Sequence, residues 1–385
     1  MKYLRHIAAF FKKETVLCIA ALLAALSAFF VPPSAEYLSY PDYRVLALLF
    51  CLMLVVAGLQ SIGVFRFLGE RLLVRVHTAR QLALLLTMLC FFSAMLITND
   101  VALLTFVPFG IMVLSMAGLE ELLIPVIVLQ TIAANLGSML TPIGNPQNLY
   151  LYSAFSLAPG AFLLHMFPLT ALSALLLILS ILLLKERPLG RLPESSEAPA
   201  NGKLPAPGKL TIYLLLFAVC LLCVARVLHW AVMLAILFVV VFLLDRGLFR
   251  KADYFLLLTF LCFFVFIGNV ERIPAIADFL RSFIRGRELL LGALFSQGIS
   301  NVPAAILLSG FTDAAGSLLY GVNVGGLGTL IASLASVISY RLYGAEKGTS
   351  KGAYLKVFTL YNLVFLLILY AAAALLLRSG LLSLF

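Results

Sequence analysis

Long apolar segments, separated by short charged ones, run along the whole chain. Three of them, 16–31, 161–184 and 354–377, are each close to the about 20 residues that a helix needs to cross the hydrocarbon core of a bilayer. Backbone groups in lipid must bond within their own segment, and the apolar residues are continuous rather than alternating. The pattern therefore predicts an all-α polytopic membrane protein and not a membrane barrel.

Polar interruptions divide this pattern into about nine spans, two of them broken, and two shorter hairpins. The predicted spans are 15–31, 43–60, 120–156 (broken), 161–185, 210–228, 229–245, 253–268, 313–340 (broken) and 354–377. The segments 81–116 and 288–312 carry polar residues halfway, which predicts re-entrant hairpins that do not cross the membrane. The amphipathic, basic segments 61–80 and 270–287 are typical of helices that lie at the membrane interface.

Composition and charge placement narrow the class of protein. With 63% hydrophobic and 11% charged residues, the chain has too few charges to cover a water-soluble fold. The net charge of +10 could suggest a nucleic-acid partner, but Lys and Arg lie between the predicted spans, so we expect none. A cytoplasmic N-terminus and an outside C-terminus place 20 of the 27 basic residues inside, which favours a bacterial inner (plasma) membrane protein.

The chain divides into two halves that resemble each other in order. The polar, proline-containing segment 186–209 predicts a cytoplasmic linker between a first repeat, 1–185, and a second, 210–385. In each half a span that begins at Asp-Tyr is followed by a basic segment, a hairpin and a broken helix. Five spans separate the starts of the two units, and an odd number inverts the second. Inverted repeats with interrupted helices are typical of secondary transporters, with the site at the interruptions.

The two interruptions within spans carry the chemistry. Gly137, Pro142, Gly144 and Pro146 prevent a continuous helix in the first half, and a glycine-rich segment at 325–328 does so in the second. Unpaired peptide groups in lipid each cost several kcal/mol, so such a segment must line a cavity or meet a partner. Exposed N–H groups at helix starts attract anions, and free carbonyls at helix ends can coordinate a cation. Four such helix starts can bind an anion without Lys or Arg.

The polar tips of the hairpins and the broken helices supply the candidate residues. Substrate-binding candidates are Thr98, Asn99, Gly144, Asn145, Gln147, Asn148, Ser300, Asn301, Gly328 and Thr329. Ion-coupling candidates are Asp100, Asn135, Gly137, Thr141, Asn323 and Gly325, with a possible Na⁺ site at Asn99, Asp100 and Asn301. An ionisable residue such as Asp100 at membrane depth is usually functional, and it could take a proton or ligate Na⁺. The competing interpretation is that the tip residues only cap their helices.

These motifs also carry a resemblance to a known family. Thr98-Asn99-Asp100, followed by Asn135 to Ser138 and Thr141 to Asn148, resembles the ion-transporter superfamily. The chain is most similar to the arsenite-permease and citrate-transporter-like branch, and more distantly to divalent anion/sodium symporters and one class of sodium/proton antiporters. The resemblance implies a homodimer with a scaffold domain, a mobile transport domain that holds both hairpins, and elevator-like alternating access.

In the symporter relatives, Ser-Asn-Thr hairpin tips contact Na⁺ and a substrate carboxylate. The resemblance assigns that role here to Thr98-Asn99-Asp100 and Ser300-Asn301. This chain departs from that pattern, because Asp100 and Val302 stand where those relatives have threonine.

The leading hypothesis is a secondary active transporter of a small anion or oxyanion, with H⁺ or Na⁺ as the coupling ion and no cofactor. The alternative is a sodium/proton antiporter in which Asp100 is the exchange site. An ion channel is a further alternative, but inverted repeats with gated hairpins favour alternating access. A membrane-embedded enzyme is not expected, because the sequence has no nucleophile–base pair, HExxH motif or carboxylate cluster. The sequence does not name the substrate.

Overall fold

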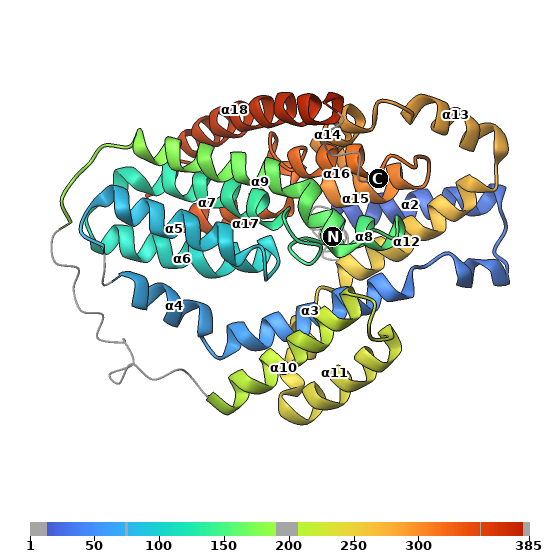
Figure 1. The fold of residues 1–385 in the computed structure, drawn as a ribbon, viewed down its shortest axis with the longest axis horizontal. Helices are drawn as coiled ribbons and strands as arrows, with labels where there is room; N and C mark the ends of the chain where they lie inside the picture. Colours follow the sequence, from blue (N-terminus) through green and yellow to red (C-terminus); the bar gives the residue numbers. More distant parts are fainter. Residues whose placement is uncertain (1–13, 74–75, 190–206, 347, 380–385) are drawn as a thin grey trace, which may run out of the picture.

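A computed structural model describes residues 14–73, 76–189, 207–346 and 348–379, and these residues confirm the all-α prediction (Figure 1). In the described residues the only β-pairing is an isolated bridge between Thr78 and Pro188. The first 13 residues, the last six and most of the predicted linker, 190–206, lie outside the described part of the chain.

The α-helices are α2 Thr15–Phe30, α3 Tyr43–Ser61, α4 Val64–Leu73, α5 Ala79–Ser93, α6 Asn99–Met116, α7 Leu123–Ser138, α8 Pro146–Ala154, α9 Pro159–Leu182, α10 Pro207–Val224, α11 Trp230–Leu244, α12 Tyr254–Glu271, α13 Pro274–Ile284, α14 Glu288–Ile299, α15 Asn301–Ser309, α16 Ala315–Val324, α17 Leu334–Ala345 and α18 Lys351–Arg378. Short 3-10 helices are η1 Ala35–Ser39, η2 Glu120–Leu122, η3 Arg246–Lys251 and η4 Leu330–Ala332.

Seven helical segments of the described chain are long and apolar enough to cross a membrane. They are α3, α6, α7 with η2, α9, α10, α12 and α18. The predicted spans at 15–31 and 229–245 correspond to the shorter apolar helices α2 and α11. Conversely α6, which the sequence placed in a hairpin, is by itself 18 residues long. Length alone therefore does not fix the number of spans, which stays a prediction.

Contacts with the end of α9 show that α5 and α6 form a closed hairpin. The guanidinium of Arg80, at the start of α5, donates to the carbonyl of Leu184 at 2.9 Å. Glu121, shortly after α6, pairs with Arg187 at 2.6 Å. The chain thus enters α5 and leaves α6 at the same end of α9, as the predicted first hairpin requires.

The second hairpin, α14 and α15, closes toward the other end of α9. Glu288 at the start of α14 accepts a hydrogen bond from Thr312, beyond α15, at 2.9 Å. Glu288 also lies against α16, whose Tyr320 stacks on His165 of α9 with ring centroids 4.2 Å apart. His165 is near the start of α9, and residues 165–182 rise about 26 Å along the helix, close to the thickness of a hydrocarbon core. The two hairpins therefore open toward opposite ends of α9.

The order of elements in one half recurs in the other. A 3-10 helix, a long helix, a short amphipathic helix, a hairpin, a broken helix and a long helix follow one another from η1 to α9 and from η3 to α18. The first long helix of each half is capped by an aspartate. The tyrosine that follows this aspartate donates its hydroxyl to a carbonyl five residues upstream, Tyr43 to Leu38 at 2.6 Å and Tyr254 to Phe249 at 2.8 Å. These parallels support the predicted repeat, whose inversion across a membrane stays a prediction.

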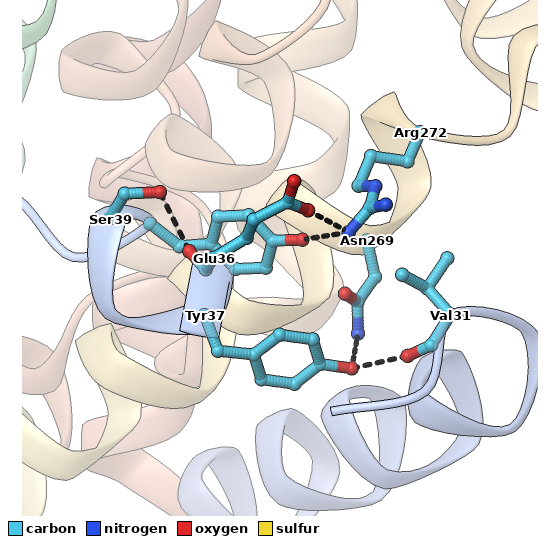
Figure 2. Close-up of polar contacts among 7 residues, drawn as sticks. Val31, Glu36, Tyr37, Ser39, Asn269 and Arg272 are labelled. Atoms are coloured by element: carbon cyan, nitrogen blue, oxygen red, sulfur yellow. Dashed lines mark hydrogen bonds and ion pairs between the residues drawn. The ribbon is translucent and has the colours of Figure 1, made fainter. Parts of the chain in front are cut away.

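The helix before the first 3-10 helix of each half, α2 or α11, packs on the other half. α2 packs along α12 of the second half, and α11 packs on α3 of the first. Polar contacts tie α12 to α2 and to η1. Asn269 donates to Ser27 of α2 at 3.0 Å. It also donates to the hydroxyl of Tyr37 in η1 at 2.7 Å, and Arg272 pairs with Glu36 of η1 (Figure 2). This exchange binds the two halves into one framework.

Candidate functional site

The first break, between α7 and α8, is held by Asn148. Its amide Nδ2 is directed at the carbonyls of Ser138, Met139 and Thr141, at 3.4, 3.1 and 3.3 Å. Asn145 caps α8 by accepting from the backbone N–H of Asn148 at 2.9 Å. The carbonyls left free where α7 ends thus find a donor that belongs to the next helix.

The tip of the first hairpin lies directly on this break. The backbone N–H of Asn99 donates to the carbonyl of Gly144 at 3.1 Å, and the hydroxyl of Thr141 donates to the carbonyl of Met95 at 2.5 Å. The side chain of Asn99 donates to Oδ1 of Asn135 at 3.1 Å. The structure therefore brings together the predicted residues of the first tip and the first break.

Two glycines of the first break are required by close backbone approach. A Cβ on Gly137 would lie 2.0 Å from the carbonyl oxygen of Phe91 in α5. A Cβ on Gly144 would lie 2.1 Å from the carbonyl oxygen of Ser138. Any side chain at either position would collide with backbone, so these glycines let the hairpin and the break pack together.

The second break, between α16 and α17, is held by Gln297 of the second hairpin. Its Nε2 donates to the carbonyls of Gly325 at 2.8 Å and Leu327 at 3.0 Å, and its Oε1 accepts from the N–H of Thr329 at 2.9 Å. The hydroxyl of Thr329 donates back to the carbonyl of Gln297 at 3.0 Å. Gly328, at φ +105°, passes close to this amide. Sequence reasoning missed Gln297, for which the available signal was a single amide within the apolar first helix of the second hairpin.

The second tip is strained and closely packed. Ser300 has φ +73° and ψ +153°, a region that L-residues rarely adopt, at a cost of about 1–3 kcal/mol. Asn301 is 4% exposed, and its Nδ2 lies 2.8 Å from where a Cβ on Gly326 would be. Neither Thr98 nor Ser300 makes a side-chain capping bond to its helix. Capping alone therefore does not account for these two polar residues.

Buried amides join the two breaks across the halves. Asn323 donates to Oδ1 of Asn148 at 2.7 Å and accepts from Asn145 at 3.2 Å. Ser333 donates to Oδ1 of Asn135 at 2.8 Å. In each half, the asparagine before the break bonds to the residue at the N-cap position of the helix after the other break, Asn323 to Asn145 and Asn135 to Ser333. We call these five residues the asparagine interlock.

The directions of the hydrogen bonds in this network leave the side-chain Nδ2 of Asn135 without an acceptor among the described residues. The N–H of Asp100 donates to Oδ1 of Asn99 at 3.0 Å, so Asn99 must present its Nδ2 to Asn135. Asn135 then accepts on Oδ1, and its Nδ2 is buried without a partner among the described residues. The Oγ of Ser336 and the Oδ1 of Asp100 are buried and unpartnered in the same sense. An orphaned amide donor of this kind calls for an acceptor.

The surroundings are polar but carry little charge. The tips and breaks, at 94–100, 139–145, 299–301 and 325–333, contain no Lys or Arg, and Asp100 is their only acid. Gln147 is buried at the start of α8, whereas Thr329 is exposed. Within the described residues no group of three His, Cys, Asp or Glu side chains could hold a metal ion. The assignment of individual residues to substrate or to coupling ion stays a prediction.

Comparisons with known proteins agree with the resemblance of the motifs. The sequence profile of the citrate transporter family matches residues 7–317. An uncharacterised transporter of Methanocaldococcus jannaschii is 30% identical over 86% of this chain and 89% of its own length. The inner membrane protein YbiR of Escherichia coli is 32% identical over 82% and 84%. The silicon efflux transporter LSI3 of rice is 34% identical over 33% of this chain and 26% of its own.

Proposed function

The chain belongs to the citrate transporter family, and from that premise we propose that it is a secondary active transporter of a small anion or oxyanion, coupled to H⁺ or Na⁺. Membership confirms the predicted branch of the ion-transporter superfamily. Together with the relatives named as transporters, it confirms a multi-pass membrane transporter rather than an enzyme. The Escherichia coli relative supports an inner-membrane location.

The observation that carries the proposal is the convergence of both tips and both breaks on the asparagine interlock. The helix starts there offer N–H groups, and the side chains offer amides and hydroxyls. The tips and breaks contain no Lys or Arg that would bind an anion in their place. The unused Nδ2 of Asn135 adds a buried donor in the same network. A small species with several oxygen acceptors suits such a donor-rich site. The family is named for citrate and the rice relative for silicon, so the cargo we propose is a carboxylate or an inorganic oxyanion.

Asp100 is the proposed coupling residue. It lies in the first turn of α6 at the first tip, and its Oδ1 is buried without a partner among the described residues. A proton or a cation there would satisfy the carboxylate, and the two would compete for the same oxygens. The same buried acid supports the second candidate, a sodium/proton antiporter with Asp100 as the exchange site and no anion bound.

Alternating access by an elevator-like movement fits the opposed hairpins. The proposed transport domain holds both hairpins, both broken helices, α9 and α18, and the proposed scaffold holds α2–α4 and α10–α13. Since the hairpins open toward opposite ends of α9, each would cover the site on one side. The proposed assembly is a homodimer joined through the scaffold.

Uptake by proteoliposomes tests the proposal. Radiolabelled carboxylates and inorganic oxyanions are offered under a Na⁺ gradient, a pH gradient or neither, and we expect one class to accumulate only with a gradient. Asp100→Asn keeps the size of the side chain, so the protein should fold. It should lose coupled transport and its pH dependence, while anion binding, measured by thermal shift, persists. Asp313→Asn, in an exposed loop, is the matched control and should transport normally.

Two other outcomes would redirect the assignment. Sodium/proton exchange without accumulation of any anion, abolished by Asp100→Asn, would establish the antiporter instead. Wild-type transport with an unchanged pH profile in Asp100→Asn would make Asp100 a structural residue.

A further inference from the structure

The two halves contact each other unequally at the boundary between the proposed domains. α3 packs on α8, and α12 packs on α15. By the order of elements, the pair α3 and α8 corresponds to α12 and α17 in the other half. The pair α12 and α15 corresponds to α3 and α6. In the described residues these pairs do not pack comparably, apart from a hydrogen bond from Gln60 to Thr105 at 3.3 Å. The packing at this boundary is therefore asymmetric between the two halves.

The broken helices can be matched residue by residue. Asn145 and Ser333 each occupy the capping position of the helix that follows its break. Counting onward in the same register, Ser153 near the end of α8 corresponds to Arg341 in α17. A neutral hydroxyl in one half thus matches a guanidinium in the other.

Ser153 has a defined role at the domain boundary. Its hydroxyl donates to Oδ2 of Asp42 at 2.9 Å, while Oδ1 of Asp42 caps α3. The counterpart of Asp42 is Asp253, which caps α12 in the same way. Asp253 and Arg341 are both exposed, and neither forms an ion pair with another residue of the described chain.

We propose that Asp253 and Arg341 form an ion pair in the opposite-facing state and stabilise that state as a latch. In a transporter built from inverted repeats, each half can adopt the arrangement that the other half now has. The contact of Asp42 with Ser153 would then break, and its counterpart would form. This inference rests on the proposed alternating access.

Charge makes the two contacts unequal. The contact in this structure joins a carboxylate to a hydroxyl, whereas its counterpart joins a carboxylate to a guanidinium. Exposed ion pairs contribute about 0.2–1 kcal/mol, which changes the ratio of two states by up to about five-fold. A bias of that size matters to a transporter whose two facing states must both be populated.

Kinetics from each side test the latch. Asp253→Asn and Arg341→Gln remove the ion pair, and Asn preserves the cap of α12. Each variant should raise KM for substrate offered from the side where the second hairpin opens, by up to about five-fold, because that state becomes rarer. The double variant should raise it no further. Ser153→Ala, which weakens the opposing contact, should lower the same KM.

Crosslinking supplies a readout that does not depend on the substrate. The pair Asp253→Cys and Arg341→Cys should form a disulfide in oxidised membranes, stop transport and release it on reduction. Asp253→Cys with Arg378→Cys is the control and should not crosslink. If the wild type transports, but Asp253→Cys with Arg341→Cys never crosslinks and the KM values of Asp253→Asn and Arg341→Gln equal that of the wild type, the latch is wrong and the proposed function stands. If the first pair crosslinks but no transport occurs under any gradient, the two residues approach each other as inferred, but the proposed function, on which a latch between facing states depends, is wrong.

Discussion

Replacing Asn323 by Asp tests the asparagine interlock with little change of shape. The side chain is 2% exposed, and its Nδ2 donates to Oδ1 of Asn148 at 2.7 Å and to the carbonyl of Leu319 at 2.8 Å. A carboxyl group keeps the acceptor that faces Asn145 but sets oxygen against oxygen at the other two contacts. Each lost bond destabilises the fold by about 1–3 kcal/mol, so the expected total is about 2–6 kcal/mol.

Asn362→Asp is the matched control. Asn362 is also fully buried in a membrane helix, but its Nδ2 makes one bond, to the carbonyl of Phe358 in the same helix at 2.9 Å. Both variants bury a carboxyl group, so the difference between them isolates the bond across the halves. Unfolding of the purified proteins in one detergent should show Asn323→Asp less stable than Asn362→Asp by about 1–3 kcal/mol. Equal stabilities would refute the interlock as a junction between halves.

Three further substitutions test neighbouring features in the same unfolding assay. Gly137→Ala should destabilise by about 1–3 kcal/mol or more, because its Cβ meets a carbonyl of α5, whereas Gly160→Ala, with open space around it, should not; equal effects would contradict the close approach. Ser300→Gly should stabilise, because relief of about 1–3 kcal/mol of backbone strain exceeds the about 0.4–1 kcal/mol that glycine costs through the unfolded chain, and a loss of stability would show that the strain is absent. Tyr37→Phe removes the bond from Asn269 and the bond to the carbonyl of Val31, and it should destabilise by about 1–3 kcal/mol; a neutral result would show that the Tyr37 hydroxyl does not tie η1 to α12.

Much of the site could be predicted because its residues contradict their surroundings. Glycine, proline and asparagine within apolar segments cannot continue a lipid-exposed helix, so 135–148 and the two tips stood out. The sequence also matched Thr141 of the first break with Thr329 of the second, and each threonine hydroxyl donates to a backbone carbonyl of the hairpin in its own half, that of Met95 or Gln297. Gln297 was missed because a single amide in an apolar helix has many possible partners, and only the fold shows that it meets the second break.

Packing partners were beyond the sequence for a different reason. The apolar pattern reports which residues avoid water. Because lipid and the protein interior are equally apolar, the apolar residues of α2 and α12 do not indicate that the two helices pack together. Asn269 was one polar clue to that contact, and its partners come from the other half. Likewise the length of α6 suits a span, and only the contacts of Arg80 and Glu121 with the end of α9 show that its hairpin closes.

The exchange of α2 and α11 between the halves has a consequence for biosynthesis. α2 leaves the ribosome roughly 220 residues before α12, which at ~5–20 residues per second is a wait of about 10–45 s. During that time α2 must persist without its partner. Its hydroxyl at Ser27 is already bonded to the carbonyl of Ala24 at 2.8 Å, so the helix presents no orphaned polar group to lipid. The amide of Asn269 supplies the N–H donors that need partners, and Asn269 is synthesised after Ser27 and Tyr37. Their hydroxyl oxygens are therefore already present to accept these hydrogen bonds.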